Sequence, residues 1–244
     1  MPWRKLRFFA FSPLFISILW QSILIPASVA VKVTFEPPKG QPAPKVTAGG
    51  GRRGGDKCGM SSSPDGVNTP DQKLTPLIPS SKLGITTSAN PTFLVYVPQS
   101  SAKAIEFSLE NQKGEGIYQT TVNLQSTPAI ISVPLPKNES KLEVDKDYKW
   151  LVSLQCQQAT ASDPFEIALV RRIEPDIALK NNLDKAKPLD KVALYGKSGV
   201  WFEAVENLAK LRQSHPKNSE LNKAWKDLME SVGLDSIADA PLQN

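Results

Sequence analysis

The sequence predicts a mainly β chain that ends in helices, and three observations carry this prediction. Between Leu74 and Ile173, apolar residues recur at every second position in short runs that turn residues separate. After Pro175 the apolar residues recur with the period of a helix. The 244 residues are 40% hydrophobic and 22% charged, a composition that can bury a core and that excludes a multi-span membrane protein and a wholly disordered chain.

Residues 1–30 have the pattern of a secretory signal peptide. Three basic residues lie among the first seven, a mostly apolar stretch covers residues 8–25, and small residues follow at positions 28 and 30. The alternative is an uncleaved anchor, since the apolar stretch approaches the length that spans a bilayer. Because polar residues and a proline interrupt that stretch, we expect cleavage after Ala30 and a mature chain that begins at Val31.

The charge balance gives little support to nucleic-acid binding. The whole chain has 29 Lys and Arg against 24 Asp and Glu, but three of the basic residues and none of the acidic ones belong to the signal peptide. The mature chain has 26 basic residues against 24 acidic ones, a net charge of +2. We therefore expect no nucleic-acid partner, and no membrane span after signal cleavage.

Residues 31–73 are predicted to form an extended N-terminal arm. The stretch from Thr34 to Gly84 contains eight prolines and nine glycines. A stretch of this composition can bury too little apolar surface to offset the entropy of ordering the chain. Within it, three glycines precede Arg52 and Arg53, and such a run can bind an anion through backbone N–H groups and guanidinium groups. The alternative, which we favour, is a solvated loop in which the two arginines are only candidate contacts for an anion or a partner.

Residues 74–173 are predicted to form a β-sandwich. Strands are expected near Leu77 and over residues 93–97, 105–109, 118–124, 131–135, 148–154 and 165–169. About seven short strands in about 100 residues are typical of an immunoglobulin-like or fibronectin-type-III-like antiparallel sandwich. Leu142 precedes Tyr148 by six residues at the start of a strand, which is the spacing of a tyrosine corner in such sandwiches.

The two cysteines are predicted to form a disulfide bond. Cys156 shares the strand parity of Trp150 and Val152, so it faces the core, whereas Cys58 lies in the arm. In an exported protein an isolated cysteine pair is most simply a disulfide. The alternative is two free thiols, since a metal site would need more ligands than the chain supplies. The bond would tether the arm to the sandwich.

Residues 174–244 are predicted to be helical. Pro188 suits a first helical turn, and Gly233 suits the end of the last helix, where Leu234 can close back on it. The apolar faces of two helices comprise Trp201, Ala204, Val205, Leu208 and Leu211, and then Leu221, Trp225, Leu228, Met229 and Val232. The spacing resembles a tetratricopeptide repeat, but only one repeat and a following helix fit. We therefore expect a helical hairpin that packs on the sandwich.

We expect no catalytic residue, no cofactor and no metal site. One histidine and two cysteines leave little for nucleophilic or metal chemistry, and His215 lies where a helix ends. Glu203 and Glu206, on adjoining turns of a predicted helix, are the carboxylate pair on which a hydrolytic alternative rests. They lie beside Lys210 and other charged residues, which favours an ordinary solvent-facing helix surface.

Several motifs together resemble a known family. They are the Gly-Gly-Gly-Arg-Arg-Gly-Gly-x-x-Cys run ending at Cys58, Leu-Thr-x-Leu-x-Pro from Leu74, Pro-Thr-Phe-x-x-Tyr-Val-Pro from Pro91, Leu-Glu-Val-x-x-x-Tyr-x-Trp from Leu142 and Tyr-Gly-x-x-Gly-Val-Trp from Tyr195. Over about residues 49–242 the chain resembles the cyanobacterial domain-of-unknown-function family 928. The resemblance implies an exported cyanobacterial protein without an assigned activity, and it supplies no catalytic residues.

Two function classes follow from these observations. The first is a noncatalytic protein-interaction or structural module of the periplasm or cell surface, whose partner is an envelope or secreted protein. The second is a hydrolase of envelope polymers that uses paired carboxylates. We favour the first, because the carboxylate pair has the surroundings of an ordinary helix surface.

Overall fold

The computed structural model describes residues 1, 3, 31–40, 43, 57–60, 70–156 and 163–243. Nine strands form two sheets in this part of the chain. The four-stranded sheet has the order β1-β3-β6-β9, formed by Thr75–Pro76, Thr92–Val97, Ala129–Pro134 and Leu242–Gln243. The five-stranded sheet has the order β2-β8-β7-β4-β5, formed by Leu83–Thr86, Phe165–Arg172, Asp147–Gln155, Ala104–Glu110 and Gly116–Asn123.

The predicted sandwich is confirmed in its main strands, and the prediction that all strands pair antiparallel is wrong. Strands β3 to β8 coincide with the six runs of alternating residues, and they pair antiparallel with one another. Strands β2 and β9 were not predicted, and each pairs parallel, β2 with β8 and β9 with β6. Both are short, so neither carries an alternating pattern that could reveal it.

Alternating apolar residues build one core between the two sheets. Phe93 from β3 lies with its ring centroid 4.8 Å from that of Phe107 and 5.1 Å from that of Trp150, both on the five-stranded sheet. All three side chains are fully buried. Such aromatic contacts across a sandwich contribute beyond the area they bury.

The loop that leads into β7 is fixed by its side chains. The Tyr148 hydroxyl accepts a hydrogen bond of 2.9 Å from the backbone N–H of Glu143, which is the contact expected of a tyrosine corner. Asp147, the first residue of β7, forms a buried ion pair with Arg171 of β8, directly opposite it in the sheet. Its carboxylate therefore has a structural partner.

Four helices follow the sandwich, two more than the predicted hairpin. They are α1 (Ile177–Lys185), α2 (Pro188–Lys197), α3 (Trp201–Ser214) and α4 (Ser219–Glu230). As predicted, α2 begins at Pro188, and Gly233 follows α4 with a φ of 76°. The N–H groups of Gly233 and Leu234 bond to the carbonyls of Glu230 and Met229, which closes the end of α4.

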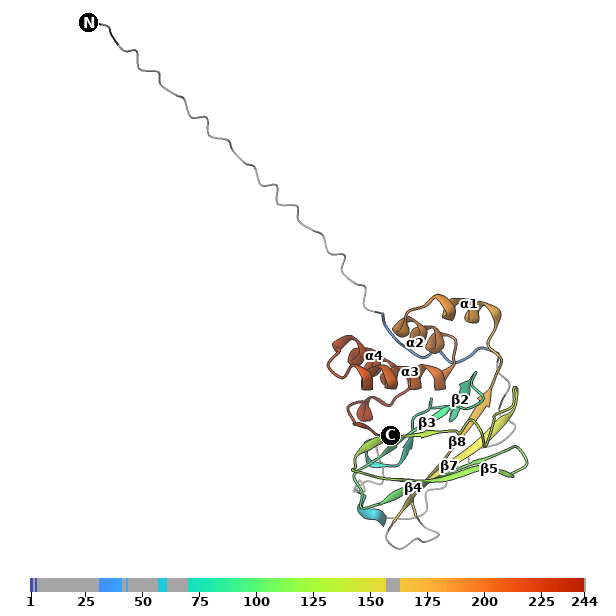
Figure 1. The fold of residues 1–244 in the computed structure, drawn as a ribbon. Coiled ribbons are helices and arrows are strands. Elements are labelled where there is room, and N and C mark those ends of the chain that lie inside the picture. Colours follow the sequence, from blue (N-terminus) through green and yellow to red (C-terminus); the bar gives the residue numbers. More distant parts are fainter. Residues whose placement is uncertain are drawn as a thin grey trace.

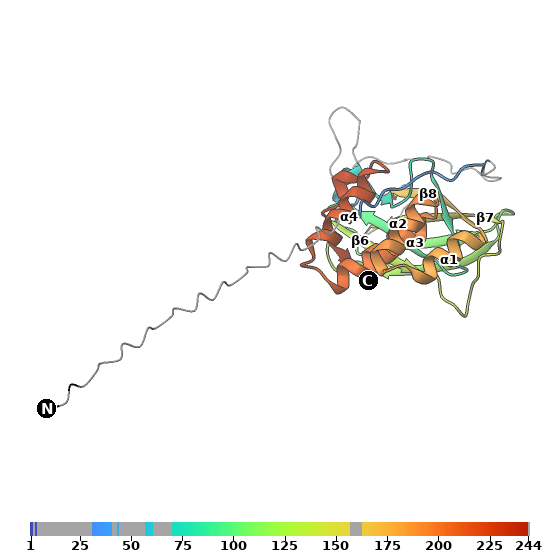
Figure 2. The ribbon, with the colours of Figure 1, turned by 90° about the horizontal axis from the view of Figure 1, so that it is seen from above.

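The helices lie over the sandwich on the side of β2 and β3, and β4 and β5 lie on the side away from them (Figures 1 and 2). Helix α3 makes the contact. The Phe202 ring lies 5.3 Å from that of Phe93, and the Trp201 indole N–H donates a 2.7 Å hydrogen bond to the carbonyl of Leu77. A Cβ on Gly84 would lie 2.5 Å from the Phe202 ring, so only glycine fits there. The helices and the sandwich therefore share one core.

Part of the predicted N-terminal arm is packed against the helices. Val33 is fully buried, and Phe35 stacks edge-on against Trp201 with ring centroids 5.3 Å apart. The arm passes so close to α2 that a Cβ on Gly196 would lie 2.6 Å from the carbonyl oxygen of Thr34. The N–H groups of Phe35 and Glu36 also donate to the Ser231 hydroxyl and the Gly196 carbonyl, each at 3.0 Å. These contacts bury a stretch whose Pro- and Gly-rich surroundings predict little burial.

No helix among the described residues is long and apolar enough to cross a membrane. The signal peptide expected over residues 1–30 lies almost entirely outside the described residues. Val31, the expected first residue of the mature chain, packs half-buried against the core.

Candidate functional site

Glu203 is buried, which corrects the expectation that it lies on a solvent-facing helix surface. Its Oε1 atom accepts hydrogen bonds from the Thr86 hydroxyl (2.8 Å), the Thr87 N–H (2.8 Å), the Thr87 hydroxyl (3.0 Å) and the Ser88 N–H (2.8 Å). One carboxylate oxygen thus holds the loop between β2 and β3. The loop lies more than 100 positions away from Glu203 along the chain, so the helical pattern around Glu203 could not reveal this contact.

Burial raises the pKa of Glu203 above its ordinary value of 4.5, and the hydrogen bonds from Thr86 and Thr87 oppose that rise. Among the described residues, its Oε2 atom is buried without a hydrogen-bond partner. Burial also raises the pKa of Tyr195, with a smaller effect from the charge of Glu203. The first turn of α3 favours a negative charge at this position. Glu203 is thus arranged to fix the loop between β2 and β3.

Glu206 lies one turn further along α3, beside a groove of about 380 Å³ between α3 and the four-stranded sheet. Its Oε1 atom accepts from the Thr92 hydroxyl at 2.7 Å and pairs with Lys210 Nζ at 2.5 Å. The other residues lining the groove are Leu94, Ser132, Pro134, Ala209 and Gln213. Glu203 does not line this groove, so the two carboxylates do not face a common space as a hydrolytic pair must.

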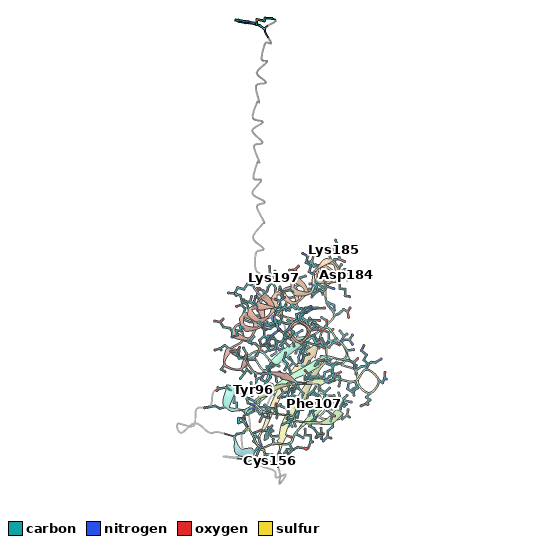
Figure 3. The ribbon with its side chains drawn as sticks, turned by 60° about the vertical axis from the view of Figure 1, so that its left-hand side comes forward. Tyr96, Phe107, Cys156, Asp184, Lys185 and Lys197 are labelled. Atoms are coloured by element: carbon teal, nitrogen blue, oxygen red, sulfur yellow. A yellow bond between two sulfur atoms is a disulfide. The ribbon has the colours of Figure 1, made fainter. Side chains whose placement is uncertain are left out.

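The predicted disulfide between Cys58 and Cys156 is present, with the two Cα atoms 5.2 Å apart. Cys156 directly follows the last residue of β7. It lies at one end of the molecule, and α1 and α2, marked by the labels Lys185 and Lys197, lie at the opposite end (Figure 3). The Ser101 N–H also donates to the carbonyl of Cys58. The bond therefore fastens the arm to the far end of the sandwich.

Thiol titration of the purified, oxidised protein is expected to detect no free cysteine, because the chain has two cysteines and both are bonded. Replacing both with serine should lower the free energy of unfolding by about 2–4 kcal/mol, because the bond restrains the unfolded chain. Urea denaturation with and without a reductant measures this loss. Two reactive thiols, or a reductant that leaves the unfolding midpoint unchanged, would contradict the assignment.

The two arginines proposed as anion or partner contacts, Arg52 and Arg53, lie outside the described residues. Two other arginines have structural roles. Arg171 pairs with Asp147, and Arg172 donates a 2.7 Å hydrogen bond to the carbonyl of Leu142. No group of three or more His, Cys, Asp or Glu side chains that could hold a metal occurs among the residues that the structure describes.

Strand β5 forms an exposed edge of the five-stranded sheet. It pairs with β4 on one side only, and its eight residues, GIYQTTVN, include no charged residue and no proline. The other sheet edges in the described chain are shorter, with two residues in β1, four in β2 and two in β9. The alternating pattern predicts this strand but not its place at an edge, and the absence of charges along it is the one signal in the sequence that favours an edge.

The backbone of β5 offers free hydrogen-bonding groups at alternate residues. Leu124, just beyond the strand, donates to the carbonyl of Lys103 opposite it. Since antiparallel partners exchange hydrogen bonds at every second pair, Tyr118, Thr120 and Val122 bond to β4. The N–H and C=O groups of Gln119, Thr121 and Asn123 therefore point away from the sheet. The register with β4 shifts at Ile117 and is regular from Tyr118 to Asn123. Edges without charge or proline are the edges on which other strands add.

Comparisons with known proteins assign the chain to a family. The family model described as "Domain of Unknown Function (DUF928)" matches residues 48–242. No curated protein matches the sequence. Among solved structures, a solution NMR structure titled "putative cell surface protein (272-376 domain)", from Methanosarcina acetivorans, matches with 16% identity and a TM-score of 0.30 over 43% of this chain and 95% of that chain. The extent of the family match shows that this chain belongs to the DUF928 family.

Proposed function

We propose that the protein is an exported, noncatalytic interaction module of the periplasm or cell surface, whose partner is an envelope or secreted protein. The observation that carries the proposal is the exposed β5 edge with its unpaired backbone groups at Gln119, Thr121 and Asn123. Natural sheets usually protect such an edge with charges, prolines or bulges. The register of β5 with β4 shifts at Ile117, and beyond that shift the edge from Tyr118 to Asn123 has neither a charge nor a proline. This part of the edge suits binding through the addition of a strand.

Two observations support export. The first thirty residues have the charge and apolar pattern of a signal peptide. The Cys58–Cys156 bond suits an oxidising compartment, since disulfides persist outside the cytosol and are rare within it.

We further propose that the sandwich is immunoglobulin-like. The support is the strand order in the two sheets, the parallel pairing of the short β2 with the last long strand β8, and the hydrogen bond between Tyr148 and Glu143. The tetratricopeptide-like spacing of α2 and α3 is, on this view, a local packing motif of two helices that bind to the sandwich. Interaction sandwiches of this kind use their exposed strands, which agrees with a role for β5.

A hydrolytic function is less well supported. A catalytic carboxyl group must reach the proton that it transfers. Both oxygens of Glu203 are engaged or buried, and the carboxylate of Glu206 is paired with Lys210. The raised pKa of Glu203 has a sufficient cause in its burial.

Photo-crosslinking in intact cells tests the proposal. A photoreactive amino acid in place of Thr121 is expected to give a covalent adduct in the envelope or secreted fraction. The same amino acid in place of Ser153, which lies in the central strand β7, is the matched control and should give none. The absence of an adduct from Thr121, or equal adducts from both positions, would overturn the proposal.

A further inference from the structure

We infer that the strand which adds to β5 is β5 of a second copy of this chain, so that two five-stranded sheets join into one. This inference rests on the proposed function and names the partner at the same edge. The argument depends on the register that the free backbone groups allow and on the charges that this register brings together.

One antiparallel register uses all three free residues. If Thr121 lies opposite Thr121 of the second copy, then Gln119 lies opposite Asn123 and Asn123 opposite Gln119. Each of these pairs can exchange two backbone hydrogen bonds, because their N–H and C=O groups all point outward. Ile117 lies beyond this set, and its carbonyl already accepts a 2.9 Å hydrogen bond from the Ser140 hydroxyl.

The side chains match in this register. On the outer face, threonine lies opposite threonine and an amide opposite an amide, both of which can hydrogen-bond across strands. On the inner face, Thr120 lies opposite Val122, and Tyr118 opposite Leu124. These last two side chains already pack, half-buried, against the core. A two-fold axis through Thr121 therefore places like side chains opposite each other on the outer face, and on the inner face only Thr120 and Val122 differ in polarity.

The absence of charge favours a second copy over a different protein. Symmetric pairing places Thr121 opposite its own copy and brings the two β5 strands side by side, where like charges would repel, and β5 carries no charge. Glu115, in the turn before β5, accepts from the Asn111 amide at 2.6 Å and lies at the end of the strand away from Thr121. The other acidic side chains beside β5 belong to β4, where Glu110 pairs with Lys149 at 2.6 Å and Glu106 accepts from Gln155 and Gln119. In the joined sheet the two β4 strands are about 14 Å apart, beyond the screening length at physiological salt. A foreign strand would find no charged group on β5 to select it.

Sedimentation of the purified, oxidised protein tests the inference. The wild-type protein is expected to sediment as a dimer at concentrations on the order of 10–100 μM, the range of a small, transient interface. The variants Thr121→Lys and Thr121→Glu should each be monomeric, because each places two like charges directly opposite one another. Ser153→Lys, on a central strand, should remain dimeric. Thermal midpoints of all three variants, compared with that of the wild type, verify folding.

The decisive sample is an equal mixture of the Thr121→Lys and Thr121→Glu proteins, which should form a dimer again because opposite charges then face each other. A wild-type protein that is monomeric over the whole range, or a mixture that stays monomeric, overturns self-pairing. If self-pairing fails while Thr121 still crosslinks to a different envelope protein, the proposed function stands and only the identity of the partner changes. If no adduct forms either, both proposals fail.

Discussion

Replacing Trp201 with alanine is expected to lower the free energy of unfolding by about 3–5 kcal/mol, the usual cost of removing a fully buried aromatic side chain. The indole contacts the ring of Phe35 in the arm, and its N–H bonds to the carbonyl of Leu77 beside the sandwich. The arm, the helices and the sandwich thus share this one residue. Thermal unfolding followed by near-UV and far-UV circular dichroism measures the loss.

The helices and the sandwich should unfold in one transition in both the wild type and the Trp201→Ala protein, because Phe202 and Trp201 place both halves in one core. Trp201→Phe is the matched control. It keeps most of the volume and loses the hydrogen bond to Leu77, so its cost should be about 1–3 kcal/mol. An unchanged melt, or two separate transitions, would show that the helices are an independent unit.

Replacing Glu203 with alanine should cost about 3–5 kcal/mol, because it leaves the partly buried N–H groups of Thr87 and Ser88 and two hydroxyls, one of them the buried hydroxyl of Thr86, without their acceptor. Glu203→Gln keeps an oxygen that can accept the same hydrogen bonds and removes a buried charge. Its stability at pH 8 should equal or exceed that of the wild type. Urea denaturation of the wild type, Glu203→Ala and Glu203→Gln separates the loss of the hydrogen-bond acceptor from the loss of the buried charge.

The stability of the wild type should also depend on pH through Glu203. Because its folded-state pKa is raised, the folded protein keeps a proton that the unfolded chain has lost, so stability falls as pH rises from the ordinary value of 4.5 toward the folded-state pKa. Over that pH window the free energy of unfolding of the wild type should therefore fall relative to that of Glu203→Gln. A difference that stays constant with pH would show that Glu203 is as ionised in the folded protein as in the unfolded chain.

The sequence reveals those parts of the fold whose pattern is local. Strands β3 to β8 are evident because one face of each is buried, so apolar residues alternate over six or more positions. The disulfide follows from the same parity at Cys156 together with the expected export. The C-terminal end of α4 can be predicted from Gly233, because the residue that ends a helix often has a positive φ, which favours glycine.

The parts that sequence could not reveal depend on residues far apart in the chain. The buried role of Glu203 comes from a loop that is remote along the chain, whereas its neighbours Lys210 and Glu206 make the helix look solvated. The packing of the arm at Val33 and Phe35 depends on Gly196 of α2, which lets the backbone of Thr34 approach, and on the ring of Trp201. The place of β5 at an edge depends on the order of strands in the sheet, which no single strand encodes. These tertiary contacts decide the candidate site.

Amide hydrogen exchange along β5 tests most directly whether this edge is free to bind. In dilute protein, the amides of Gln119, Thr121 and Asn123 should exchange rapidly, while those of Thr120 and Val122, bonded to β4, should be protected. In concentrated protein the first three should become protected, by about 10-fold or more, because a second strand then accepts their hydrogen bonds. Protection of Gln119, Thr121 and Asn123 at every dilution would contradict the account, because the edge would then be covered within a single chain.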